Sequence, residues 1–223
     1  ELHVRCLALD NGATQLVFAV VDSVSVPRDV FDEAKRLIHE ATGIPPEHMM
    51  MSATHTHSAG NARGANPVDW GVPYPEEEQA RLSTLDPGFS RPLHPYQRFL
   101  VRRIADGVRR ALNNLESARI GWGAGQVPQH VYSRRWVLKE GFTAPNPFGG
   151  RDRSAKSPPR EQRLRPAGPV NPEVFFVSVQ SAAGRPIALL ANYWLHYAGT
   201  GGSGPVFSAD YFGVFCDRIQ ELL

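Results

Sequence analysis

Three histidines in this sequence each follow an apolar stretch and precede a loop of small residues. His55 and His57 lie two positions apart within Ser52-Ala53-Thr54-His55-Thr56-His57-Ser58-Ala59-Gly60, and His196 follows an apolar run over 187–195. In an extended segment, side chains at i and i+2 point the same way, so His55 and His57 either converge on one ion or divide the roles of ligand and neighbour. Neutral imidazole is a preferred ligand of Zn²⁺. The pattern predicts a catalytic zinc site to which His196 also contributes.

The sequence offers two carboxylates near these histidines. A catalytic zinc ion usually has three protein ligands and a water. Asp22 follows an apolar run, and Asp210 opens the last helical segment, so both are candidates by position. A carboxylate near a ligating histidine is as often the partner that fixes its tautomer. The remaining histidines have no such context, and we expect them to be structural or exposed (His3, His39, His48, His94 and His130).

Nucleophilic catalysis is the main rival interpretation, because Ser52 and Ser58 flank the histidine pair. The Gly-x-Ser-x-Gly elbow of serine hydrolases is not present, and Gly202-Ser203-Gly204 is too loose a match. Cys6 and Cys216 lie in strand and helix patterns that usually bury a small apolar side chain. No phosphate-binding loop or dinucleotide fingerprint appears. Metal-dependent hydrolysis therefore remains the favoured chemistry.

The elements before His55 predict how it is positioned. Residues 2–9 and 15–22 have strand patterns, and Asp10-Asn11-Gly12 between them favours a hairpin turn. Residues 28–42 have the apolar period of a helix that Gly43 would end, and 48–53 form the next strand. Strand, helix and strand in this order predict a parallel βαβ unit. Such a unit places residues 22 and 55 beyond the carboxyl ends of neighbouring strands, where open α/β sheets have their sites.

The rest of the chain adds helices and strands to this unit. We expect a long helix over 94–115, strands over 118–124, 174–180 and 186–194, and a final helix near Asp210 with Ser208 as its N-cap. Two Pro- and Gly-rich stretches, 61–93 and 143–172, are predicted as long loops or surface excursions. The expected fold is α/β, with a mixed, largely buried β-sheet flanked by helices, as a single domain over 1–223.

The composition excludes some classes of protein. The chain has 223 residues, of which 42% are hydrophobic and 21% charged, which is enough for a sizeable core. Its formal net charge of +2 gives no reason to expect a nucleic-acid partner. No apolar run approaches the ~20 residues that cross a bilayer. The sequence does not indicate an oligomeric state.

The histidine motif resembles a known family. Ser52-Ala53-Thr54-His55-Thr56-His57-Ser58 resembles the signature of the neutral/alkaline non-lysosomal ceramidases. Ala191-Asn192-Tyr193-Trp194-Leu195-His196 and the following Phe207-Ser208-Ala209-Asp210-Tyr211 are similar to that family's second histidine strand and the helix after it. Ser133-Arg134-Arg135, Lys139-Glu140-Gly141 and Arg165-Pro166-Ala167-Gly168-Pro169 resemble bacterial ceramidase-like proteins. The resemblance extends over most of the chain from about residue 2.

The resemblance implies a zinc-dependent amidase that cleaves the N-acyl bond of ceramide to sphingosine and a fatty acid. It makes His55 a zinc ligand and His196 the second ligand. It places His57 beside the metal, in proton transfer or transition-state binding. Arg134, rather than Arg135, would line the active site and stabilise negative charge.

The resemblance also implies what lies outside this sequence. The family's remaining zinc ligands, a glutamate and a tyrosine, would follow Leu223, so we expect an N-terminal part of the catalytic domain that binds zinc weakly by itself. It further implies a secreted or periplasmic protein, a small lipid-like amide as substrate, and contact with a membrane surface. The stretches 61–93 and 143–172 differ from the loops of well-studied ceramidases. Hydrolysis of another N-acyl compound or ester, or a non-catalytic ceramidase-like binding module, therefore stays open as an alternative.

Overall fold

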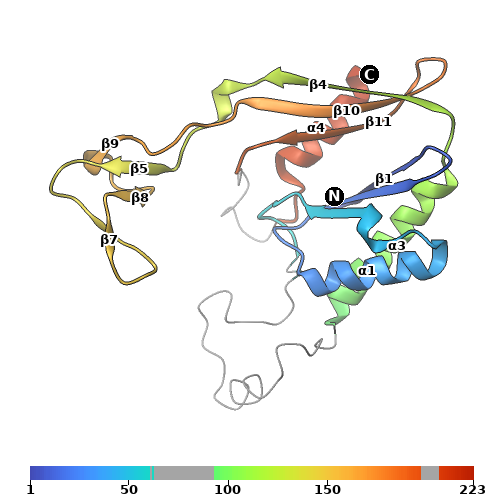
Figure 1. The fold of residues 1–223 in the computed structure, drawn as a ribbon, viewed down its shortest axis with the longest axis horizontal. Helices are drawn as coiled ribbons and strands as arrows, with labels where there is room; N and C mark the ends of the chain where they lie inside the picture. Colours follow the sequence, from blue (N-terminus) through green and yellow to red (C-terminus); the bar gives the residue numbers. More distant parts are fainter. Residues whose placement is uncertain (61, 63–92, 197–205) are drawn as a thin grey trace, which may run out of the picture. The chain divides into compact units, whose positions relative to one another are not determined.

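The computed structural model describes residues 1–60, 62, 93–196 and 206–223. The chain forms two compact units (Figure 1). The first comprises Glu1–Ser117 and Tyr197–Leu223, and the second is Ala118–His196. The chain therefore leaves the first unit after Ser117 and returns to it after His196.

A three-stranded mixed sheet lies at the centre of the first unit, in the order β1-β2-β3. β1 (Val4–Asp10) and β2 (Gln15–Val21) are antiparallel, and their turn contains Gly12 at φ 84°. β2 and β3 (Met49–Ala53) are parallel and are connected through α1 (Arg28–Thr42) and the short helix η1 (Pro46–His48). The predicted hairpin and the predicted parallel βαβ unit are both confirmed.

Two amphipathic helices cover one face of this sheet. α1 ends at Gly43, which has the left-handed φ of 76° that glycine adopts most easily. At the start of α3 (Pro95–Asn113), the ring of His94 accepts the N–H of Tyr96, and the side-chain oxygen of Gln97 accepts the N–H of His94. Their apolar faces pack with β2 and β3 into the core of the unit, which includes Val17, Ala19, Val21, Val30, Ala34, Ile38, Met49, Leu100, Ile104 and Val108. Both helices were predicted from the 3.6-residue period.

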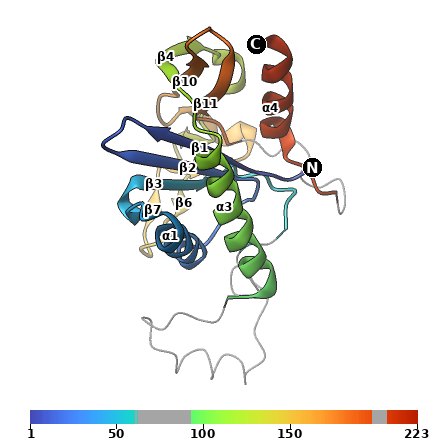
Figure 2. The same cartoon turned by 90° about the vertical axis from the view of Figure 1, so that its right-hand side faces the viewer.

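The third long helix, α4 (Asp210–Leu222), lies on the other side of β1 from α3 (Figure 2). Neighbouring residues of a strand point to opposite faces. Cys6 points to α3, where its sulfur lies 2.8 Å from where a Cβ on Gly107 would be. Arg5 points the other way, and its positive charge acts on the Cys216 thiol of α4. The sheet thus has helices on both faces.

The second unit contains an antiparallel sheet in the order β11-β10-β4. Its strands are β4 (Ala118–Gln126), β10 (Glu173–Ser181) and β11 (Pro186–Tyr193). β10 and β11 are joined by a turn with Gly184 at φ 87°. All three strands were predicted, to within two residues at each end.

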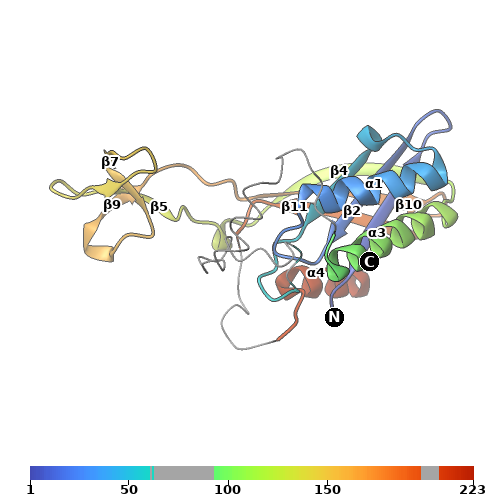
Figure 3. The same ribbon diagram turned by 90° about the horizontal axis from the view of Figure 1, so that it is seen from below.

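Between β4 and β10 the chain forms a small all-β module. β5 (Arg135–Leu138) lies between β8 (Ser154–Lys156) and β9 (Arg163–Pro166), and β6 (Ala144–Pro145) pairs with β7 (Arg151–Asp152). Figure 3 shows β5, β7 and β9 gathered together. The 3₁₀ turns η3 (Pro128–His130) and η4 (Arg160–Gln162) complete this part. The sequence predicted an irregular excursion over 143–172, because strands of two to four residues are too short to show a period.

The observed architecture confirms an α/β fold with a mixed sheet flanked by helices. Almost all of the predicted loop 61–93, and the glycine-rich stretch 199–204, lie outside the described residues. Within the described residues, no helix combines the length and apolar character that a membrane span requires.

Candidate metal centre

His55 follows β3 and has an unusual backbone conformation. Its φ of 71° lies in the left-handed region, which is costly for a residue with a Cβ. Its N–H donates to the carbonyl of Ser23 at 2.9 Å, and the N–H of Thr54 donates to that of Val21 at 2.9 Å. Strained residues persist where surrounding contacts hold them, and they cluster at functional sites. The connection after β2 therefore positions His55.

The His55 imidazole is oriented by a backbone carbonyl. Its Nδ1 lies 2.6 Å from the carbonyl oxygen of Val24. A carbonyl oxygen can only accept, so Nδ1 carries the proton, and in the neutral ring Nε2 has the lone pair. Ligating histidines usually donate their second ring N–H in this way, which fixes the tautomer and the ring orientation. Nε2 of His55 is therefore prepared to bind a cation.

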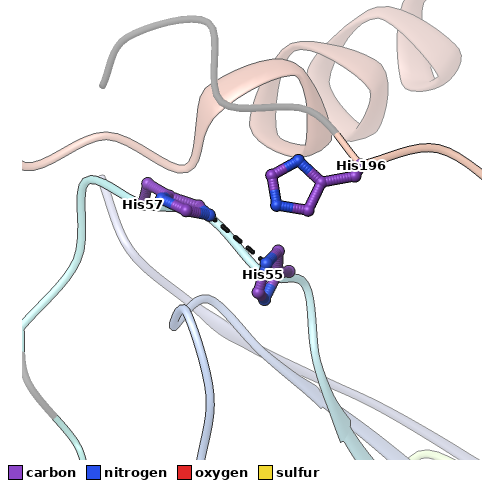
Figure 4. Close-up of side chains that lie close together, drawn as sticks. All are labelled: His55, His57 and His196. Carbon is purple, nitrogen blue, oxygen red and sulfur yellow. Dashed lines mark hydrogen bonds between the residues drawn. The ribbon is translucent and has the colours of Figure 1, made fainter. Parts of the chain in front are cut away.

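His57 lies directly beside this nitrogen (Figure 4). Its Nε2 is 3.3 Å from Nε2 of His55, the ring centroids are 4.8 Å apart, and the rings are nearly perpendicular at 87°. His57 is exposed, while His55 is partly buried. The two imidazole nitrogens therefore lie side by side, although the left-handed backbone of His55 is not the extended segment on which the prediction was based. His196, also drawn in Figure 4, belongs to the second unit.

The loop that carries both histidines is fastened to the entrance of α4. Thr56, between the histidines, is fully buried, and its hydroxyl donates to the carbonyl of Ser208 at 2.7 Å. The N–H of Ser208 donates in turn to the carbonyl of Ser58 at 2.8 Å. Ser208 also accepts the N–H of Asp210 at 3.0 Å, although the N-cap position itself is Ala209. The histidine loop and the residues before α4, 150 positions apart in the sequence, are therefore joined. No local sequence pattern predicts this contact.

The two acidic candidates occupy different surroundings. The side chain of Asp22 is buried, and its Oδ2 accepts from Arg5 at 2.7 Å and from the N–H of His3 at 2.9 Å. This ion pair ties β1 to the end of β2. Asp210 is the first residue of α4, has φ 56°, and accepts the N–H of Tyr211 at 2.8 Å. The contacts of Asp22 are those of a structural carboxylate.

His196 and Arg134 line one pocket of the second unit. The pocket has a volume of about 260 Å³, and three segments form its wall: His130–Arg134, Pro169–Asn171 and Trp194–His196. Tyr132 and Trp194 are 75% and 76% exposed. The pocket thus offers a cation and an imidazole next to two accessible aromatic rings. Sequence reasoning missed both aromatics, since neither follows a period.

Backbone hydrogen bonds hold Arg134 and Arg135 in place. The carbonyl of Arg134 accepts the N–H of Ser157 at 2.7 Å, and the carbonyl of Arg135 accepts the N–H of Ala167 at 2.9 Å. Among the described residues, no carboxylate lies within ion-pairing distance of the Arg134 guanidinium. Arg135 is exposed on β5, opposite Lys156. Of the two arginines, Arg134 is the one that lines the pocket.

No protein-family model and no curated protein matches this chain. Solved structures do. A structure described as ceramidase complexed with C2 matches with a TM-score of 0.56 and 18% identity, over 93% of this chain and 28% of that one. The neutral ceramidase from Pseudomonas aeruginosa matches with a TM-score of 0.54 and 18% identity, over 89% of this chain and 26% of that one. This chain has a ceramidase-like fold.

The ceramidase-like fold spans only part of the solved ceramidases, 28% and 26% of their length. The match covers residues of both units, because neither unit alone amounts to 93% of the chain. The residues present in this ceramidase-like chain fit a metal: the lone pair on Nε2 of His55 is oriented by the Val24 carbonyl, and a second imidazole nitrogen lies beside it.

Proposed function

We propose that this chain is part of a zinc-dependent hydrolase of linear amides. Its substrate is an N-acyl sphingoid lipid of the ceramide type, and its products are a sphingoid base and a fatty acid. The observation that carries the proposal is the pair of imidazole nitrogens, 3.3 Å apart, with His55 held in a single tautomer. The ceramidase-like fold supports it.

In this proposal His55 and His196 bind the zinc ion. Each follows a strand, β3 or β11, and each presents an imidazole beyond its end. Further ligands come from parts of the protein outside this sequence. A bound zinc ion lowers the pKa of a coordinated water toward neutrality and polarises the acyl carbonyl.

His57 and Arg134 act on the substrate. Because His57 is exposed beside His55, it can hold or move a proton between the attacking water and the leaving amine. The Arg134 guanidinium lines the pocket with His196 and stabilises the negative charge that develops on the acyl oxygen. Its charge is available for this role because the described residues provide it with no carboxylate.

The aromatic side chains of the pocket account for a lipid-like substrate. Tyr132 and Trp194 present large, exposed aromatic surfaces at this pocket. Each offers a flat face to a hydrocarbon chain and a polar atom to the hydroxyl or amide groups of the headgroup. We include a secreted or periplasmic location in the proposal, supported by the ceramidase-like fold alone.

The test uses the full-length protein from which this chain comes. We expect stoichiometric zinc and hydrolysis of a fluorescent ceramide, and we expect His55→Ala and His196→Ala to lose both. His3→Ala is the matched control, since His3 is exposed in the same unit. Full activity in the metal-free protein, in His55→Ala or in His196→Ala would contradict the proposal.

A further inference from the structure

Basic residues are concentrated in the small all-β module. Residues 134–166 contain nine arginines and lysines but only three acidic residues, whereas the rest of the chain has more acidic than basic residues. In the first unit, arginines on β1, α1, α3 and α4 form ion pairs with carboxylates. No arginine or lysine of 134–166 has a carboxylate partner among the described residues. The module therefore carries an uncompensated positive charge.

The strand register gathers part of this charge on one face. In an antiparallel pair, directly opposite residues point to the same side. Arg135 lies opposite Lys156, and Val137, two positions along, lies opposite Arg165. All three cations are exposed. The sheet β8-β5-β9 thus has a basic face, formed by Arg135, Lys156 and Arg165.

The other face of the same sheet holds the module together. Trp136 points there, and the Arg163 guanidinium lies over its ring at 5.1 Å. Leu138, on that face too, is almost completely buried. The basic face therefore belongs to a formed sheet whose packing lies on its opposite side.

An exposed phenylalanine stands at the tip of the neighbouring hairpin. Phe148, between β6 and β7, is 94% exposed. The turn is formed by Asn146, whose side-chain oxygen accepts the N–H groups of Phe148 and Gly150 at 3.0 and 2.9 Å. Gly149 has φ 82°, which this turn requires. The apolar ring is thus held out into solvent by an ordered turn.

We propose that residues 134–166 bind the surface of membranes that contain anionic phospholipids. Arg135, Lys156 and Arg165 contact headgroup phosphates, and Phe148 enters the interface between headgroups and acyl chains. Clusters of basic residues bind anionic leaflets, and apolar side chains add the burial that holds a protein at the interface. A soluble acidic polymer would use the cations but not an isolated ring at a hairpin tip. This inference does not rest on the proposed hydrolysis.

The experiment measures binding of the full-length protein to phosphatidylcholine vesicles with and without phosphatidylglycerol. We expect binding only with the anionic lipid, and weakening as salt rises. The triple variant Arg135→Gln/Lys156→Gln/Arg165→Gln should weaken vesicle binding about 100-fold, because each basic residue contributes roughly fivefold to the affinity. Phe148→Ser should weaken it by about tenfold. Arg28→Gln/Arg102→Gln/Arg110→Gln removes the same charge from exposed helix positions and should bind as the original protein does.

Three results would overturn the inference. They are equal binding to neutral and anionic vesicles, equal weakening by the two triple variants, and binding to soluble polyglutamate without binding to vesicles. Circular dichroism and thermal unfolding of each variant ensure that a loss of binding is not a loss of fold. Vesicle binding by His55→Ala separates the inference from the proposed function, because that variant lacks hydrolysis but retains the module.

Discussion

At the scale of single residues, the histidine loop is held from both sides. The carbonyls of Ser23 and Val24 hold the backbone and the ring of His55, and Thr56 is joined to Ser208. These bonds offset a left-handed conformation that costs a non-glycine residue of order 1–3 kcal/mol. The position of the imidazole that we propose as a metal ligand therefore depends on residues outside the histidine pair.

Thr56→Val tests the attachment of the loop to α4. The substitution keeps the shape of the side chain but removes the donor to the partly buried Ser208 carbonyl, which should lower the free energy of unfolding by about 1–2 kcal/mol. Urea unfolding measures it. Thr14→Val, at an exposed turn position, is the control and should change little. An unchanged stability for Thr56→Val would show that this hydrogen bond does not hold the loop.

Cys6 predicts a dependence of stability on pH. Burial raises the pKa of its thiol from 9.0 to about 11. Because the folded pKa lies above the unfolded one, the contribution is fully present below pH 9.0 and is lost as pH rises through about 11. The contribution of the Cys6 thiol to the free energy of unfolding is at most about 3 kcal/mol. Unfolding curves of the protein and of Cys6→Ala should converge over this pH range, and a constant difference would contradict the assignment.

At the scale of elements, contacts between strands and helices determine how the histidine loop is presented. Arg5 and Asp22 join β1 to the end of β2, where the connection that holds His55 begins. Gly107 lets α3 approach β1 closely at Cys6. Both contacts involve residues that neighbour each other only in the folded chain.

Asp22→Asn should destabilise the protein by about 2 kcal/mol, because it leaves the Arg5 guanidinium without its buried carboxylate partner. The estimate is below that for a fully buried pair, since the Arg5 side chain is 30% exposed. Asp32→Asn, in the exposed pair with Arg28, should cost less than about 0.5 kcal/mol. Thermal unfolding measures both variants. Equal effects would mean that the Arg5–Asp22 pair is no more than a surface contact.

Gly107→Ala should destabilise the protein although alanine normally favours a helix by about 1 kcal/mol over glycine. The new methyl group would lie 2.8 Å from the sulfur of Cys6. Overpacking of this kind costs about 1–3 kcal/mol. Adding Cys6→Ala makes room and should recover most of the loss relative to Cys6→Ala alone. A stabilising Gly107→Ala would refute the close approach.

The elements that sequence predicts well are those with long periodic patterns. α1 was predicted with its observed bounds because its apolar positions, Pro27 and Gly43 all mark the same helix. The strands β6 to β9 were not predicted, since they are short and lie among prolines and arginines. At the site, the spacing of His55 and His57 indicated a shared role. The left-handed backbone of His55, the Ser208 attachment and the Tyr132–Trp194 pocket depend on tertiary contacts.

At the scale of the whole molecule, the chain divides its chemistry between two units. The histidine pair belongs to the unit formed by Glu1–Ser117 and Tyr197–Leu223, while Arg134, His196 and the basic module belong to Ala118–His196. Whether these two units form the single domain predicted over 1–223 is not tested by this division, so the single domain stays a prediction. The chain spans 28% of the length of a solved ceramidase.

The most direct test of the zinc site is a crystal structure of the full-length protein, with anomalous diffraction measured on both sides of the zinc absorption edge. We expect one strong peak at about 2 Å from Nε2 of His55 and from a ring nitrogen of His196. Two results would contradict the proposed zinc site. One is a crystal grown with zinc in which the protein is fully ordered but no peak appears there, and the other is an ion bound without either histidine.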